Sequence, residues 1–153
     1  MLCSTSFWKE KTNPIYNKVD GLERTAHRLT FPKRERMVSQ RLIDELFGGG
    51  HSSSLAAYPL RAVYLKKERH QGDVPVQLLI SVPKKRFHHA VDRNRVKRQI
   101  REGWRHHQQL LKDTLPDTQQ LLVALVWLSD QQLPTDEVEK CVVNLIQRIS
   151  EKL

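Results

Sequence analysis

The sequence KKRFHHAVDRNRVKRQIREGWR, residues 84–105, combines a helical pattern of apolar residues with most of the positive charge of the chain. It contains nine Lys or Arg and two acidic residues, so it supplies seven of the nine net positive charges of the 153-residue protein. The remaining residues are nearly neutral, with 17 basic and 15 acidic side chains. Charge concentrated in this way indicates one surface that meets a polyanion, not general solubility.

The same stretch predicts a helix with two different sides. From residue 91 to residue 115, Val96, Ile100 and Leu111 recur at helical spacing and form an apolar side. An adjoining side carries Asn94, Lys97, Arg98, Arg101 and Arg105. Arginine offers planar, bidentate contacts to phosphate, which suits a structured nucleic acid backbone. The alternative is a solvated charged helix, which normally interleaves acidic residues at i+4, and only two acidic residues are present here.

The rest of the chain predicts a mixture of helices and strands in one domain. Residues 121–128 are continuously apolar, which is typical of a strand buried on both faces inside a sheet. We expect helices over residues 33–47, 91–115 and 135–149, and strands over residues 55–58, 60–65, 76–82 and 121–128. This αβββαβα order predicts an α+β sandwich with a central sheet of about four strands. By default, the connection through the basic helix would cross right-handedly.

Length and composition limit the domain organisation and the location. We expect one domain over residues 29–153, preceded by a loosely ordered extension over residues 1–28 whose Phe7, Trp8 and Tyr16 leave a docking role open. No apolar run approaches the roughly 18 residues of a membrane span, and the N-terminus lacks the apolar core of an export signal. A cytoplasmic protein without a membrane partner is therefore expected.

Neither a metal site nor a protein-borne catalytic site is expected. The adjacent pairs His88-His89 and His106-His107 cannot chelate an ion, because neighbouring side chains on a helix or strand diverge. No glycine-rich phosphate loop and no nucleophile with a paired base is evident.

The basic stretch also resembles a known family signature. AVDRNRVKRQIRE (residues 90–102), preceded by SVPKK (residues 81–85), resembles the signature of the protein subunit of bacterial ribonuclease P. The likeness extends over about residues 29–153 and includes FPKRER at residues 31–36. Two positions depart from the family pattern: Ile43 stands where an aromatic residue is frequent, and Pro83 replaces a small or β-branched residue.

The resemblance implies a fold feature and a function. It implies a central mixed sheet with a left-handed βαβ crossover that carries the basic helix, in place of the right-handed default. It further implies a protein that binds a large catalytic RNA, in a complex that cleaves precursor tRNA endonucleolytically to form the mature 5′ end, with magnesium held mainly by the RNA. No obligate protein partner is evident. The residues expected at the catalytic RNA are Lys84, Lys85, Arg86, Arg93, Asn94, Arg95, Lys97, Arg98, Arg101 and Arg105.

A second surface implied by the resemblance is a cleft between the first helix and the sheet, which holds the single-stranded 5′ leader of the precursor. Single strands need stacking faces and a cationic rim. The chain offers Phe31, Arg34, Arg36, Ile43, Phe47, Tyr58, Arg61 and Tyr64 for this cleft. Ordinary core packing is the alternative for the aromatic residues among them.

Two other functions of the whole protein also remain open. One is a nucleic-acid-binding module without an attached enzyme, and the other is a self-sufficient hydrolase.

Overall fold

The computed structural model describes residues 30–153, and the extension predicted for residues 1–28 lies outside them. Four strands form one mixed sheet in the order β1-β2-β4-β3. The strands are β1 (Ser53–Ala57), β2 (Leu60–Glu68), β3 (Val76–Ser81) and β4 (Gln119–Trp127). β2 pairs antiparallel with both β1 and β4, whereas β3 and β4 are parallel. The predicted α+β architecture with a four-stranded mixed sheet is confirmed.

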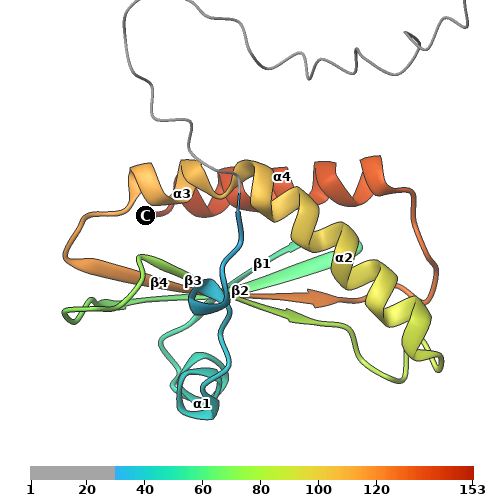
Figure 1. Cartoon of the computed structure of the whole chain (residues 1–153), viewed down its shortest axis with the longest axis horizontal. Coiled ribbons are helices and arrows are strands. Elements are labelled where there is room, and N and C mark those ends of the chain that lie inside the picture. Colours follow the sequence, from blue (N-terminus) through green and yellow to red (C-terminus); the bar gives the residue numbers. More distant parts are fainter. Residues whose placement is uncertain (1–29) are drawn as a thin grey trace, which may run out of the picture.

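Helices cover both faces of this sheet. The helical elements are η1 (Lys33–Glu35), α1 (Gln40–Gly48), α2 (Ala90–His107), α3 (Gln109–Thr114) and α4 (Thr135–Ser150). α2, α3 and α4 lie over one face, and α1 lies alone over the other (Figure 1). α2 and α3 together connect the parallel strands β3 and β4, so the basic helix is part of a βαβ crossover.

The central strand β4 explains why the core has two parts. Its odd-numbered residues, such as Val123, face α2, α3 and α4, which we call the helix layer. Its even-numbered residues, such as Ala124, face α1. We call the apolar cluster beneath α2, α3 and α4 the large core. We call the cluster beneath α1 the small core; its buried members are Met37, Leu46, Val63, Leu65, Leu122 and Ala124. Because both faces are covered, the strand must be continuously apolar, as predicted.

Two predicted helices are divided in the structure. The helix expected over residues 33–47 is interrupted, because the Met37 amide donates to the Leu78 carbonyl at 3.0 Å and Arg36 bridges to the outer edge of β3. Backbone paired with a strand in this way cannot also be helical. The helix expected over residues 91–115 changes direction at Gln108, whose buried side chain donates to the Thr30 carbonyl at 2.9 Å.

Both outer strands of the sheet have an additional contact along their edges. Beside β3 runs the segment of Arg36 and Met37 just described. On β1, the Ala56 carbonyl accepts a hydrogen bond at 2.9 Å from Arg148 of α4. No helix within residues 30–153 is both long enough and apolar enough to cross a membrane.

The adjacent α1 residues Leu46 and Phe47 should differ sharply in their effect on stability. Leu46 is fully buried in the small core, whereas Phe47 is 49% exposed. We expect Leu46→Ala to lower the free energy of unfolding by roughly 2 to 5 kcal/mol, because it removes buried methyl groups and leaves a cavity. For Phe47→Ala we expect a loss of about 1 kcal/mol or less. Urea unfolding followed by circular dichroism measures both, and equal losses would show that α1 does not pack as described.

Candidate nucleic-acid interface

The basic side of α2 faces solvent because its opposite side is locked in the large core. Val96 and Ile100 are fully buried and Trp104 is 1% exposed. On the other side of the helix, Asn94 and Arg98 are exposed, and they repeat at a spacing of four residues. Lys97, Arg101 and Arg105 lie on the same side and are partly buried. We call Asn94, Lys97, Arg98, Arg101 and Arg105 the basic stripe.

Contacts to α4 fix the rotation of α2 about its own axis. Gly103 permits close approach, since a Cβ at this position would lie 3.4 Å from the Cα of Glu139. The buried Gln99 side chain donates to the Leu133 carbonyl and to the Thr135 hydroxyl, each at 3.1 Å. The basic stripe therefore holds four cations beside Asn94 in fixed positions, a geometry that suits a regular series of phosphates.

Three of the ten residues predicted for the RNA contact are engaged within the protein. Arg86 forms an ion pair with Asp130 at 2.8 Å, and Arg105 forms one with Glu102 at 2.7 Å. Arg93 donates from Nη1 to two backbone carbonyls. The two lysines that follow β3, Lys84 and Lys85, are exposed, as is Arg95.

A second candidate surface lies on the α1 face of the sheet. On α1, Ile43 is half-buried against the small core and Phe47 is exposed. Arg61 of β2 is exposed on the same sheet face. It stands two residues before Val63 of the small core, and side chains two residues apart on a strand point to the same face. Its guanidinium donates to the Ser54 hydroxyl at 3.4 Å. The structure thus places an aromatic ring, an aliphatic side chain and a cation on the same face of the sheet.

Three aromatic residues predicted for this surface lie elsewhere. Tyr64 is 6% exposed in the large core, on the sheet face opposite α1, so its prediction for the cleft is wrong and the core alternative holds. Phe31 packs against the large core as well. Tyr58 lies in the turn between β1 and β2, where its hydroxyl donates to Ser129 at 3.0 Å and its carbonyl accepts from Cys141 of α4.

The predicted cations Arg34 and Arg36 belong to the segment along the outer edge of β3, not to the α1 packing surface. Both side chains are exposed, and the Arg36 guanidinium lies over the Phe31 ring, 5.6 Å from its centroid. A partly buried ion pair between Glu35 and Lys112 of α3, at 2.6 Å, anchors the segment.

Sequence reasoning missed Lys67, which also lies on the α1 face. Every second residue of β2 from Arg61 onward points to this face, and Lys67 is one of them. Its side chain forms an ion pair with Glu45 of α1 at 3.2 Å. The same alternation would have separated Tyr64 from Arg61, because residues three apart on a strand point to opposite faces.

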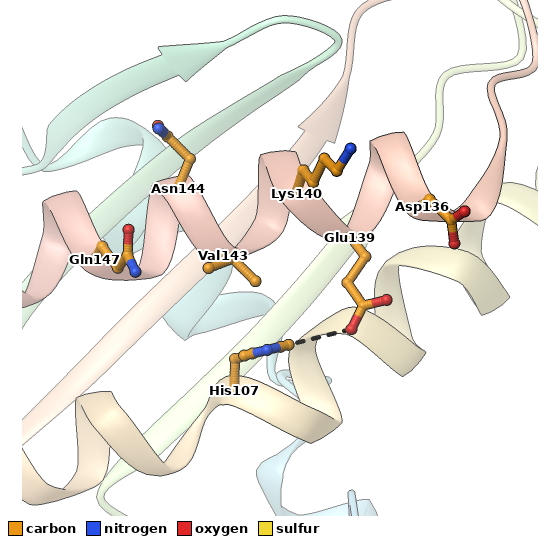
Figure 2. Close-up of a pocket in the computed structure, with 7 residues that line it drawn as sticks. All are labelled: His107, Asp136, Glu139, Lys140, Val143, Asn144 and Gln147. Carbon is orange, nitrogen blue, oxygen red and sulfur yellow. Dashed lines mark ion pairs between the residues drawn. The ribbon is translucent and has the colours of Figure 1, made fainter.

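An open hollow of about 490 Å³ lies where the end of α2 faces α4 (Figure 2). His107 of α2 lines it together with residues of α4, and a distance of 3.9 Å separates His107 Nδ1 from Glu139 Oε1. The other lining residues are Asp136, Lys140, Val143, Asn144 and Gln147. None of the predicted RNA-contacting residues lines this hollow. Within residues 30–153, no three His, Cys, Asp or Glu side chains are grouped so that they could hold a metal ion.

Known proteins match most of the chain. The family model described as Ribonuclease P matches residues 31–150. Relatives named "Ribonuclease P protein component" from two strains of Porphyromonas gingivalis are 37% identical over 119 residues, covering 77% of this chain and 85% of each relative.

Solved structures share the fold at lower sequence identity. The RNase P protein of Staphylococcus aureus gives a TM-score of 0.55 at 20% identity, covering 76% of this chain and 95% of that one. That of Thermotoga maritima gives 0.53 at 21% identity, covering 72% and 94%. The family match over residues 31–150, with the relatives at 37% identity, shows that the chain belongs to the ribonuclease P protein family.

Proposed function

We propose that this chain binds the catalytic RNA of ribonuclease P through the basic stripe, Arg95 and the exposed Lys84 and Lys85. An RNA partner follows from membership of the family. The observation that carries the proposal is the row of cations on α2, held outward by an opposite side that is almost fully buried. Phosphate contacts of this kind supply affinity and fix register without reading sequence.

The proposal extends to the α1 face, where Ile43, Phe47 and Arg61 would hold the 5′ leader of precursor tRNA. Bases of a single strand stack on aromatic side chains while a cation tracks the backbone. The leader would thus run alongside α1 over the sheet, on the face opposite α2, α3 and α4. The complex then matures the 5′ end of tRNA in the cytoplasm as an endonuclease, with magnesium held mainly by the RNA.

Reconstitution tests the function as a whole. The purified protein, added to ribonuclease P RNA from the same source, should restore cleavage of precursor tRNA at a magnesium concentration where the RNA alone is slow. An unchanged rate would contradict the assignment and favour a general nucleic-acid-binding module. Cleavage by the protein without RNA would revive the self-sufficient hydrolase.

The basic stripe should make RNA binding depend steeply on salt. On replacing Arg98 by Ala, we expect the slope of log affinity against log salt to flatten by about 0.7 to 0.9, the effect of one lost phosphate contact. Filter binding over a salt series measures the slope. Lys140→Ala is the matched control, since Lys140 is an exposed cation on α4 beside the open hollow. Equal slopes for Arg98→Ala and wild type would place Arg98 outside the interface.

The leader surface should distinguish precursor from mature tRNA. Phe47→Ala should weaken binding of leader-bearing precursor more than binding of mature tRNA, because only the precursor carries the strand that stacks on the ring. Binding of both tRNAs to the reconstituted complex measures the difference. Leu110→Ala on α3 is the control, because Leu110 is exposed to a similar extent, 44% against 49%. Equal losses for both tRNAs would indicate damage to the fold instead.

A further inference from the structure

The first arginine of the Arg-Asn-Arg motif differs from its neighbours in its contacts. Arg93 Nη1 donates to the carbonyls of Phe87 and His88, both at 2.8 Å. Its side chain is partly buried, whereas Asn94 and Arg95 are exposed. Both hydrogens of Nη1 are thus used within the protein, and a charged donor makes these bonds stronger than neutral ones.

The two acceptor carbonyls belong to residues 82–89, the loop that connects β3 to α2. Phe87 anchors this loop, since it is 8% exposed and its ring lies 6.5 Å from that of Trp127 in the large core. A turn closes within the loop where the Arg86 amide donates to the Pro83 carbonyl at 3.1 Å. The exposed Lys84 and Lys85 lie on this turn.

The position of Arg93 in the helix also favours a structural role for its side chain. Arg93 is in the first turn of α2, where the helix dipole disfavours a cation. Hydrogen bonds to two carbonyl oxygens offset that cost and at the same time satisfy acceptors in an irregular segment. A side chain whose only task was to reach a phosphate would need neither contact.

We infer that Arg93 is a positioning residue, which holds loop 82–89 so that Lys84 and Lys85 are presented to the catalytic RNA, and that it does not itself contact phosphate. The inference rests on the proposed function of α2. It divides the motif into an inward arginine that fixes a loop and an outward Asn94 and Arg95 that meet the RNA.

Hydrogen exchange in the RNA-free protein tests the structural part. Arg93→Met keeps an unbranched apolar stem but removes the donors. We expect it to speed amide exchange in peptides that cover residues 84–89, while Arg95→Met, the matched control two residues away, leaves exchange there unchanged. Unchanged exchange in Arg93→Met would overturn the inference. Should Arg93→Met not fold, Arg93→Ala, which also removes the donors, replaces it and is judged by the same two outcomes.

Binding of ribonuclease P RNA by the full chain tests the link to the two lysines. Arg93→Met should weaken binding in the wild-type background but change it by less than about twofold in a Lys84→Ala/Lys85→Ala background, within the usual error of additivity. Arg95→Met should weaken binding equally in both. An equal loss in both backgrounds for Arg93→Met would show that Arg93 contacts the RNA directly, contrary to the inference.

The outcomes separate this inference from the proposed function beneath it. If Lys84→Ala/Lys85→Ala and Arg95→Met both bind the RNA as wild type does, the α2 interface is wrong, and the role of Arg93 toward RNA is wrong with it. Exchange in the free protein then still shows whether Arg93 holds the loop. If the control variants weaken binding while Arg93→Met fails either test, the interface stands and only the inference about Arg93 is overturned.

Discussion

The close packing of α2 against α4 and the large core determines how the protein presents its charge. Cations in a row repel one another, and a loosely held helix could rotate or fray to separate them. Here the small Gly103 lets α2 approach the backbone of α4, and the buried Gln99 ties it to the start of that helix. Apolar burial on one side therefore holds together the repelling charges on the other.

The sheet separates two surfaces while connecting them mechanically. β4 contributes alternate residues to the large core and the small core, so the helix layer and α1 pack against the same strand. In the proposed function, the catalytic RNA and the leader thus contact opposite layers whose relative position is fixed by a strand that is buried along most of its length.

The sequence predicted those parts of the fold where one pattern dominates. Helical spacing located α2 and α4, and the continuous apolar run located β4. Prediction failed where tertiary contacts override local preference: residues 36–37 pair with β3 although the surrounding pattern is helical. No local pattern reveals that a strand lies beside that segment.

Among the site residues, the outward side chains of α2 follow from periodicity, whereas the partners of Arg86 and Arg93 do not. Asp130, the partner of Arg86, is 44 residues away in sequence, and Arg93 bonds to backbone carbonyls that any sequence would offer. A basic motif in the sequence therefore does not reveal which of its cations already have partners within the protein. Tyr64 is a different case, since the alternation of β2 already contained the information that places it in the core.

The contacts along the two outer strands affect how readily a second copy of the chain could add to the sheet. A strand with free amide and carbonyl groups is a template on which a second copy can add. The Arg36–Met37 segment occupies part of the β3 edge, and Arg148 occupies a carbonyl of β1, so the sheet is partly closed against strand addition at both ends. Each of these contacts brings an arginine to an edge of the sheet, and its positive charge further disfavours the approach of a second copy. These contacts therefore leave fewer free backbone groups at the two sheet edges to which a strand of a second copy could add.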